Sequence, residues 1–278
     1  MNIAFALAEV IWIMAGRNDS AFLNYYNAGL PKYCGNGPTY HGAYGHRLRK
    51  RFNMDQLARA YETLRKNPES RQVVLQIWDG IADLPTADGR PSSEDVPCNI
   101  VAMLKVRNST LEWTQIMRSN DVFRGLPYNL VQFTTLQEIL AGWLGLNVGT
   151  YNQVSDSLHV YERDLDQIKS LRPVPVEENT DSFALSKPDF DLVFPELEEG
   201  SNNITDEACT VEYLVGKVNK CTLPPAYRNV LCVLCAEGVR RRKQSGRIDE
   251  TMAHCTNPAY IQLYDRWLSR FHGDTAFC

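Results

Sequence analysis

The chain has 278 residues and a formal net charge of −4, from 29 lysines and arginines against 33 aspartates and glutamates. Hydrophobic residues make up 44% and charged residues 22%, a composition that excludes a disordered, collagen-like or coiled-coil protein. The slightly acidic balance argues against a protein that binds nucleic acid by neutralising its backbone. A chain of this length can build a full core, so its eight cysteines need not form disulfides. We therefore expect a cytoplasmic protein with free thiols.

The first apolar segment, residues 2–15, predicts a buried helix rather than a signal peptide. No lysine or arginine precedes the apolar run, and an acid, Glu9, lies in its middle. No other window approaches the ~20 apolar residues of a membrane span. The sequence therefore predicts no contact with a membrane.

Apolar periodicity and turn residues predict both strands and helices along the rest of the chain. Strands are expected at residues 73–78, 101–106, 111–117 and 149–154, the second and third joined by a turn at Asn108 and Ser109. Helices are expected at residues 54–65, 129–144, 158–171, 225–243 and 258–271. The polar segments 18–46 and 79–95, and a loose stretch from 172 to about 203, are predicted loops. Strands and helices do not alternate strictly, so we predict an α/β or α+β fold with a mixed sheet flanked by helices.

Two motifs near the predicted hairpin are suited to chemistry. Cys98 follows a proline at the entry of a strand, where a fixed backbone can present a thiol. Arg118 and Ser119 end the next strand, and a guanidinium beside a hydroxyl suits a phosphate. Each motif alone is weak, because a buried thiol or a solvated turn explains it equally well.

Two further motifs make the set specific. A Gly-x-Pro-aromatic-Asn turn runs from Gly125 to Asn129, and a His-x-Tyr pair stands at His159 and Tyr161. With the Pro-Cys and Arg-Ser-x-Asp motifs, in this order, the set resembles the thymidylate synthase family, which includes the pyrimidine nucleotide hydroxymethylases. Glu9, Tyr44-Gly45 and Ser70-Arg71 also fall where that family places equivalent residues. The resemblance covers residues 3–196 and implies the family's mixed-sheet fold, with extra helices at the C-terminal end.

The resemblance implies a mechanism for five catalytic residues. The Cys98 thiolate, its pKa lowered by Arg118, would add to C6 of a pyrimidine ring. The C5 carbon would then attack the methylene of 5,10-methylenetetrahydrofolate, while the Asn129 amide stabilises charge on O4. Glu9 would transfer protons through water, because an acid on an apolar helix has a raised pKa. Tyr44 would assist removal of the C5 proton.

The resemblance also implies binding residues and a homodimer, with no metal. Asp121 would hold the folate pterin, and Gly125 would allow its close approach. The nucleoside monophosphate would contact its own subunit and a partner subunit, which contributes Arg71. The implied substrate-binding residues are Arg71, Ser119, Asn129, His159 and Tyr161, with Arg118 also on the phosphate.

The chain departs from the family pattern at several positions. The N-terminal phosphate-binding loop is missing, which predicts either a sequence that is short at its start or a weaker phosphate site. Gln72 replaces a second arginine, Asn99 a histidine and Met117 a glutamine. The loop between Gly29 and Tyr44 lacks the family's tryptophans, and the last residues lack its apolar tail. A leakier site lets water add to the one-carbon unit, whereas a sealed site favours hydride transfer and a methyl product.

The remaining cysteines and a basic run have plainer interpretations. Cys232 and Cys235, with the His254-Cys255 pair, could be read as a zinc set, but two thiols in an apolar helical run predict core packing. The run 240–243, three arginines and a lysine, predicts a solvated helix end, with contact to a polyanion as the alternative.

These observations predict a catalytic domain at residues 1–196 and a C-terminal helical extension at residues 197–278. Family frequency places conversion of deoxyuridylate to thymidylate first. A hydroxymethylase of a uridine or cytidine nucleotide is the alternative, and a non-catalytic nucleotide-binding relative is the second alternative. Asn129 favours uracil over cytosine, although a flipped amide would reverse that preference.

Overall fold

The computed structural model describes residues 1–172 and 174–271, which divide into two compact units. One unit holds residues 9–160 and 184–187, and the other holds residues 1–8 with the described residues from 161 onwards. Helix α1 (Ile3–Met14), predicted from the apolar run, contributes to both. The predicted boundary after residue 196 lies inside helix α9 (Lys187–Thr205). The assignment of residues 1–196 as a catalytic domain therefore stays a prediction.

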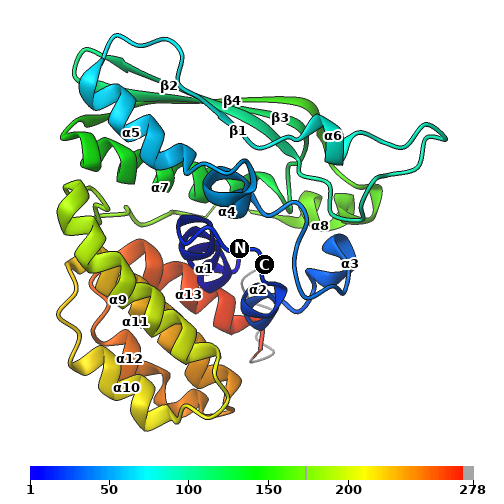
Figure 1. Cartoon of the computed structure of the whole chain (residues 1–278). Helices are drawn as coiled ribbons and strands as arrows, with labels where there is room; N and C mark the ends of the chain where they lie inside the picture. The colour runs from blue at the N-terminus through cyan, green and yellow to red at the C-terminus, as the bar shows by residue number, and fades with distance from the viewer. Residues whose placement is uncertain (173, 272–278) are drawn as a thin grey trace. The chain divides into compact units, whose positions relative to one another are not determined.

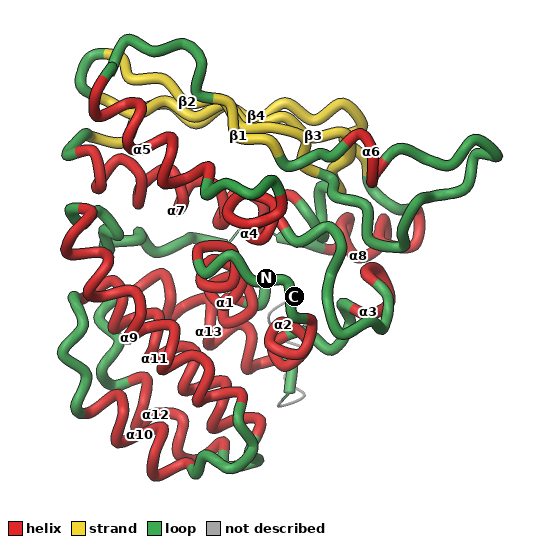
Figure 2. The backbone as a smooth tube through the Cα atoms, viewed as in Figure 1, coloured by secondary structure: helices red, strands yellow, loops and turns green. Residues whose placement is uncertain are grey.

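The first unit is built on a four-stranded mixed sheet, as predicted (Figure 2). The first two pairings are antiparallel and the third, between β3 and β4, is parallel. The β2–β3 hairpin turns at Asn108 and Ser109, whose φ angles of 48° and 58° match a two-residue turn that follows the strand twist. In spatial order the strands are β1 (Val74–Gln76), β2 (Asn99–Arg107), β3 (Thr110–Asp121) and β4 (Asn147–His159).

Helices α5 (Gln56–Lys66) and α7 (Leu126–Leu144) cover one face of this sheet (Figure 1). Alternate residues of β2 and β3, such as Leu104 and Trp113, are buried on that face. Gln137 of α7 donates to the carbonyl oxygens of Leu111 (2.8 Å) and Gly149 (3.1 Å), which ties the helix to β3 and β4. The sheet and α7 therefore form the rigid support for the side chains at their ends.

The segments predicted as loops contain short helices. Within α2, the buried residues Phe22, Leu23 and Tyr26 have helical spacing, which the polar composition around them masked. A π-helical turn, Arg47–Arg51, follows α4. The short helices are α2 (Ser20–Tyr26), α3 (Pro31–Cys34), α4 (Tyr44–His46) and α6 (Gly80–Asp83).

The second unit is helical. Residues 187–203 were expected to be irregular, yet α9 buries Phe190, Phe194 and Leu197 on one face. Pro195 within this helix and the surrounding acids explain why the pattern was missed. The helix predicted at 158–171 is also shorter, because β4 extends to His159. The remaining helices are α8 (Leu165–Ser170), α10 (Val211–Asn219), α11 (Pro225–Arg241), α12 (Ile248–Met252) and α13 (Pro258–Ser269).

The sequence predicts that the basic run at the end of α11 is a solvated helix end, but two of its arginines pair with a buried acid. Arg240 and Arg241 both pair with Glu237, at 2.7 and 2.9 Å, and the Glu237 side chain is fully buried. A buried carboxylate requires such partners, because an unpaired charge would be costly. The two arginines are therefore part of the packing of the helical unit.

Cys232 and Cys235 lie fully buried in α11, as the packing interpretation predicted. Across residues 1–172 and 174–271 no group of three or more His, Cys, Asp or Glu side chains could hold a metal ion. Within the same residues no helix has the length and apolar character needed to span a membrane. The last residues, where the missing apolar tail was noted, lie outside the described residues.

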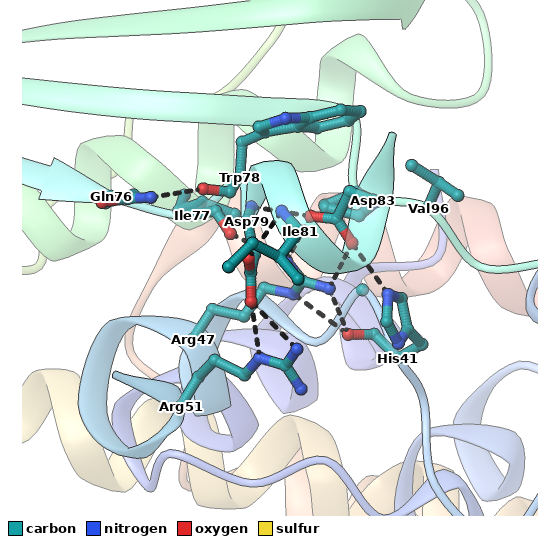
Figure 3. Close-up of polar contacts among 12 residues, drawn as sticks. His41, Arg47, Arg51, Gln76, Ile77, Trp78, Asp79, Ile81, Asp83 and Val96 are labelled. Atoms are coloured by element: carbon teal, nitrogen blue, oxygen red, sulfur yellow. Dashed lines mark hydrogen bonds and ion pairs between the residues drawn. The ribbon is translucent and has the colours of Figure 1, made fainter. Parts of the chain in front are cut away.

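A buried ion pair joins the π-helical turn after α4 to α6, which follows β1 (Figure 3). The Arg47 guanidinium bonds both carboxylate oxygens of Asp83, at 2.5 and 2.9 Å, and both side chains are fully buried. Asp83 also accepts from the Asp79 N–H (2.8 Å) and contacts the His41 ring at 2.8 Å. Burial opposes the charge on Asp83, but the bonds from Arg47, Asp79 and His41 outweigh it and hold the pKa of this carboxyl below its usual value.

Replacing this carboxylate should be costly. We expect Asp83→Asn to lower the free energy of unfolding by about 3–5 kcal/mol, because it leaves the Arg47 charge buried without a counter-ion. Chemical denaturation measures the change. The same replacement at the exposed Asp88 is the control and should stay within about 0.5 kcal/mol of the parent. Equal midpoints for the two variants would contradict the stated role of the pair.

Candidate active site around Cys98

Cys98 lies in a loop that Arg118 holds by its carbonyl oxygens. The loop leads into β2, and Arg118 extends from β3 beside it. Arg118 donates from Nε to the carbonyl of Pro97 and from Nη2 to that of Val96, both at 2.9 Å. Its backbone N–H donates to the carbonyl of Cys98, also at 2.9 Å. The half-buried thiol is thus presented by a fixed backbone, as the Pro-Cys motif suggested.

The charge state of Cys98 differs from the prediction. Burial raises the pKa of the thiol, Arg118 lowers it, and Asp95 raises it again. The effect of Arg118 therefore has the predicted direction, but desolvation outweighs it and the pKa of Cys98 lies above its ordinary value. Without a ligand the side chain is a neutral thiol at neutral pH.

A chain of buried hydrogen bonds fixes the orientation of Asn129. The Trp113 indole can only donate, and it donates to Gln115 Oε1 at 3.0 Å. Gln115 Nε2 therefore donates to Asn99 Oδ1 (2.9 Å), and Asn99 Nδ2 to Asn129 Oδ1 (3.4 Å). Asn129 Nδ2 then donates to Asn120 Oδ1 at 3.3 Å. One donor-only group thus sets every amide in this chain, which we call the amide relay.

Tyr44 interacts with the amide relay at Asn99. Burial raises the pKa of its phenol well above the usual value, and the Asn99 side chain opposes this shift. The neighbouring Gly45 packs against α1 so closely that a Cβ there would stand 2.4 Å from the carbonyl oxygen of Ile13. Only glycine allows this approach, which sets Tyr44 beside Asn99. The Tyr44-Gly45 motif therefore has a structural reason.

Glu9 occupies the centre of the apolar helix α1 and contacts α7. Gln132 Nε2 donates to Glu9 Oε2 at 2.8 Å. Burial raises the pKa of Glu9 to about 8, although the bond from Gln132 opposes the shift. The side chain is therefore poised to exchange a proton near neutral pH, as the sequence suggested.

Asp121 and Gly125 lie together where β3 passes into α7. Asp121 Oδ1 accepts from the backbone N–H groups of Phe123 (2.8 Å) and Arg124. Asp121 Oδ2 is buried and has no hydrogen-bond partner among the described residues. A Cβ on Gly125 would stand 3.1 Å from Asn120 Oδ1, so glycine is needed here. The free carboxylate oxygen is an acceptor available to a ligand.

The structure does not gather every predicted residue. His159 ends β4, paired in register with Asp121, and its Nδ1 lies 3.1 Å from the carbonyl of Ser157. It is therefore at a strand end and not at the predicted helix start. Tyr161 belongs to the helical unit and is 45% exposed, with the Arg163 guanidinium over its ring. Arg71 is exposed beyond α5.

Polar residues on buried faces complete the site and were not singled out from the sequence. Gln115 stands on the core face of β3, in line with Trp113 and Met117, and is fully buried. Gln132 is equally buried on α7. A polar residue at an apolar position of a strand or helix was the signal available, because a buried amide must find partners.

The proton affinity of Glu9 gives a testable prediction. The folded state binds this proton more tightly than the unfolded chain, so stability from Glu9 is complete at low pH and is lost as pH rises from about 4.5 to about 8. Relative to Glu9→Gln, the parent should lose at least about 1 kcal/mol between pH 5 and pH 8. Denaturation at several pH values measures it. A constant difference would contradict the buried, protonated state.

Comparisons with known proteins agree with this geometry. Residues 1–180 match the family model described as thymidylate synthase. The chain is 38% identical over 175 residues to a deoxyuridylate hydroxymethyltransferase of Bacillus phage SP01, covering 59% of this chain and 45% of that protein. The corresponding enzyme of Pseudomonas phage M6 is 36% identical over 190 residues, covering 66% and 53%.

A solved structure shows the same fold. Thymidylate synthase from T4 phage superposes with a TM-score of 0.51 at 23% identity, covering 69% of this chain and 74% of that one. The chain spans about half the length of the curated relatives it matches. The family model covers most of the chain and includes all of the residues around Cys98. The chain belongs to the thymidylate synthase family.

Proposed function

We propose that this protein transfers a one-carbon unit from 5,10-methylenetetrahydrofolate to C5 of deoxyuridylate and releases the 5-hydroxymethyl nucleotide. The observation that carries the proposal is the amide relay. It fixes which atoms of Asn129 donate and accept, and it bonds Asn129 to Asn99, the residue that follows Cys98. The curated phage relatives described above carry the same activity in their names.

The donor order of the amide relay supports uracil as the base. The second N–H of Asn129 Nδ2 is suited to O4 of uracil, and the second lone pair of Oδ1 to its N3–H. Cytosine presents the opposite pattern, an amino group at C4 and an acceptor at N3. A flip of Asn129 would break its bonds to both Asn99 and Asn120. The sequence left this flip open, and the structure provides the physical reason against it.

The residues around the base supply the chemistry. Cys98 gives up its proton to solvent as its sulfur adds to C6, since its resting thiol is neutral. The negative charge that develops on O4 is stabilised by the Asn129 amide, which the relay holds in place before reaction. Glu9 exchanges protons near neutral pH, and Tyr44 assists removal of the C5 proton.

The residues at the β3–α7 junction fit a folate. Asp121 Oδ2, buried and without a partner among the described residues, matches the N–H-rich edge of a pterin. Gly125 keeps the turn open beside it. When bound, methylenetetrahydrofolate supplies the one-carbon unit. The protein's part is to hold the pterin through Asp121 and to orient the nucleotide through Asn129.

The phosphate and ribose contacts are assigned by family position. Arg118 already uses Nε and Nη2 on the nucleophile loop, so its remaining N–H groups and the Ser119 hydroxyl are available to the phosphate. His159 and Tyr161 are assigned to the ribose hydroxyl. These assignments require the nucleotide to reach from the Cys98 loop to the end of β4.

A homodimer would complete the phosphate site with Arg71 from the partner subunit. The sheet face opposite α5 and α7 supports this assembly. Val74 and Val154, which stand on that face, are 51% and 53% exposed within one chain. Exposed valines among the polar residues of this face are suited to contact with a second copy.

Thymidylate formation is the second candidate function. It is favoured by family frequency and by relatives such as a putative thymidylate synthase of Methanothermobacter marburgensis, 34% identical over 128 residues. A non-catalytic relative that only binds nucleotide is disfavoured by the joint presence of Cys98, Glu9 and Asn129 in one site.

Product analysis tests the proposal. The protein is incubated with methylenetetrahydrofolate and each of the uridine and cytidine monophosphates, ribo and deoxy, and the products are weighed. We expect 5-hydroxymethyl-deoxyuridylate with tetrahydrofolate from deoxyuridylate. Thymidylate with dihydrofolate would select the second candidate. If no nucleotide reacts, and 5-fluoro-deoxyuridylate forms no adduct at Cys98, the enzyme proposal is wrong.

The role of Asn129 can be tested separately. We expect Asn129→Asp to lower kcat/KM for deoxyuridylate by about a hundredfold or more, because a carboxylate removes the donor to O4. Turnover of deoxycytidylate relative to deoxyuridylate should rise, since the carboxylate accepts from the amino group at C4. The same substitution at the exposed Asn147 is the control and should change neither value. Unchanged base preference in Asn129→Asp would contradict the recognition argument.

A further inference from the structure

An acid next to the nucleophile loop is not used by the mechanism above. Asp95 stands three residues before Cys98. Its Oδ2 accepts from the Gly42 backbone N–H at 2.7 Å, and its own N–H donates to Ser93 Oγ at 3.2 Å. Gly42 thus anchors the carboxylate and Ser93 anchors the backbone, and the residue is half-buried, so that water can reach it.

Gly42 allows the loop from Gly35 to Tyr44 to approach this acid, and Gly35 lies against the neighbouring Glu94. A Cβ on Gly42 would stand 3.0 Å from both the Asp95 carbonyl oxygen and Oδ1, which is tighter than most side chains tolerate. A Cβ on Gly35 would collide with the Glu94 carboxylate at 2.4 Å, and Gly35 also has a φ of 78°. The loop that lacks the family's tryptophans is therefore packed against the segment that leads to Cys98.

A second thiol, just before this loop, interacts with Asp95. Cys34, the last residue of α3, lowers the pKa of the Asp95 carboxyl through its side chain, and Asp95 raises the pKa of Cys34 in return. The charges of Asp95 and Glu9 each raise the pKa of Cys34, and Asp95 also raises those of Cys98 and Tyr44. These groups are therefore close enough to interact electrostatically.

We propose that Asp95 is the general base that takes a proton from the water added to the one-carbon unit, and that Cys34 positions its carboxylate. This inference rests on the proposed function, and it names the residue that directs the reaction to a hydroxymethyl product. Cys34 acts through Asp95 and is a positioning residue. An ordinary apolar residue at 95 would leave the water without a base.

The step balances without an oxidant or a reductant. After condensation the nucleotide carries a methylene group double-bonded to C5, with Cys98 on C6. The water oxygen bonds to the methylene carbon, and its proton passes to Asp95. The electron pair of the C5–methylene double bond moves through C5 to the C4 carbonyl. It then re-forms the C5–C6 double bond as the Cys98 thiolate leaves, and no hydride is transferred.

Burial, the largest effect on Asp95, raises its pKa above the usual value, while the bonds from Gly42 and Cys34 oppose the shift. A carboxylate with a raised pKa is a stronger base than one in water. A positioned base contributes about a hundredfold to ten-thousandfold to such a proton transfer. That margin is enough to decide between attack by water and transfer of hydride.

The test separates water addition from the earlier steps. With deoxyuridylate tritiated at C5, tritium release reports addition of Cys98 and condensation, whereas chromatography reports the hydroxymethyl product. In the parent we expect the two rates to be equal. In Asp95→Asn we expect tritium release to continue, while the ratio of hydroxymethyl product to tritium falls at least tenfold. The stranded methylene, an electrophile, should then be captured by added 2-mercaptoethanol as a thioether.

A second measurement needs no turnover. Because the Asp95 charge raises the pKa of Cys98, Asp95→Asn should speed alkylation of Cys98 by iodoacetamide at pH 7.5, followed by peptide mass spectrometry. A misfolded variant would not combine faster alkylation with continued tritium release. Cys34→Ser should keep the product ratio, since a hydroxyl still donates to Asp95, and Cys34→Ala should lower it.

The controls distinguish failure of this inference from failure of the proposed function. Asp88→Asn, in the same segment but exposed, should behave as the parent. A parent that releases no tritium, or that forms only thymidylate, would refute the proposed function. A parent that forms hydroxymethyl product, with an unchanged product-to-tritium ratio in Asp95→Asn, would overturn the role of Asp95 alone.

Discussion

The indole N–H of Trp113 sets the orientation of the buried amides in the candidate site. An amide can present its oxygen or its nitrogen to a ligand, and only its other partners decide which. Here the first member of the amide relay has no acceptor, so the direction of every following bond is fixed. The relay crosses from β3 to β2 and then to α7. The relative position of strand and helix thereby decides which atoms Asn129 can present to a ligand, and the hydrogen-bonded amides also hold the core in one arrangement.

Burial sets the proton affinity of the titratable side chains around the amide relay. Glu9, Cys98 and Tyr44 all have raised pKa values, and in each case burial is the largest cause. The resting site therefore holds protons, on a thiol, a phenol and a carboxyl, instead of charges. Such a site costs less to fold than one with a buried thiolate. As a consequence, the Arg118 charge alone does not ionise Cys98.

The parts of the structure with strong local signals could be predicted from the sequence. The apolar run of α1, the turn at Asn108 and Ser109, and α7 lie where the periodicity placed them. The end of β4 could not be placed, because His159 is in a strand only through its parallel pairing with Asp121, a contact distant in sequence. Helix α9 was missed because its buried aromatics are separated by acids and a proline.

The residues of the candidate site also divide into those with a local sequence signal and those without one. Residues in short motifs, such as Cys98 and Asn129, were found, whereas Gln115 and Gln132 act through partners that only folding brings near. The loop from Gly35 to Tyr44 illustrates what this implies for product choice. The sequence showed only what the loop lacks, namely the tryptophans that exclude water. The structure shows that the Cys34 thiol and the Asp95 carboxylate interact there instead, and that Gly42 donates to the carboxylate. Loss of an apolar wall would merely admit water at random. A thiol and a carboxylate at a defined place give that water an orientation and a proton acceptor. In the inference drawn above, this region therefore binds water as a reactant where the family's tryptophans would exclude it.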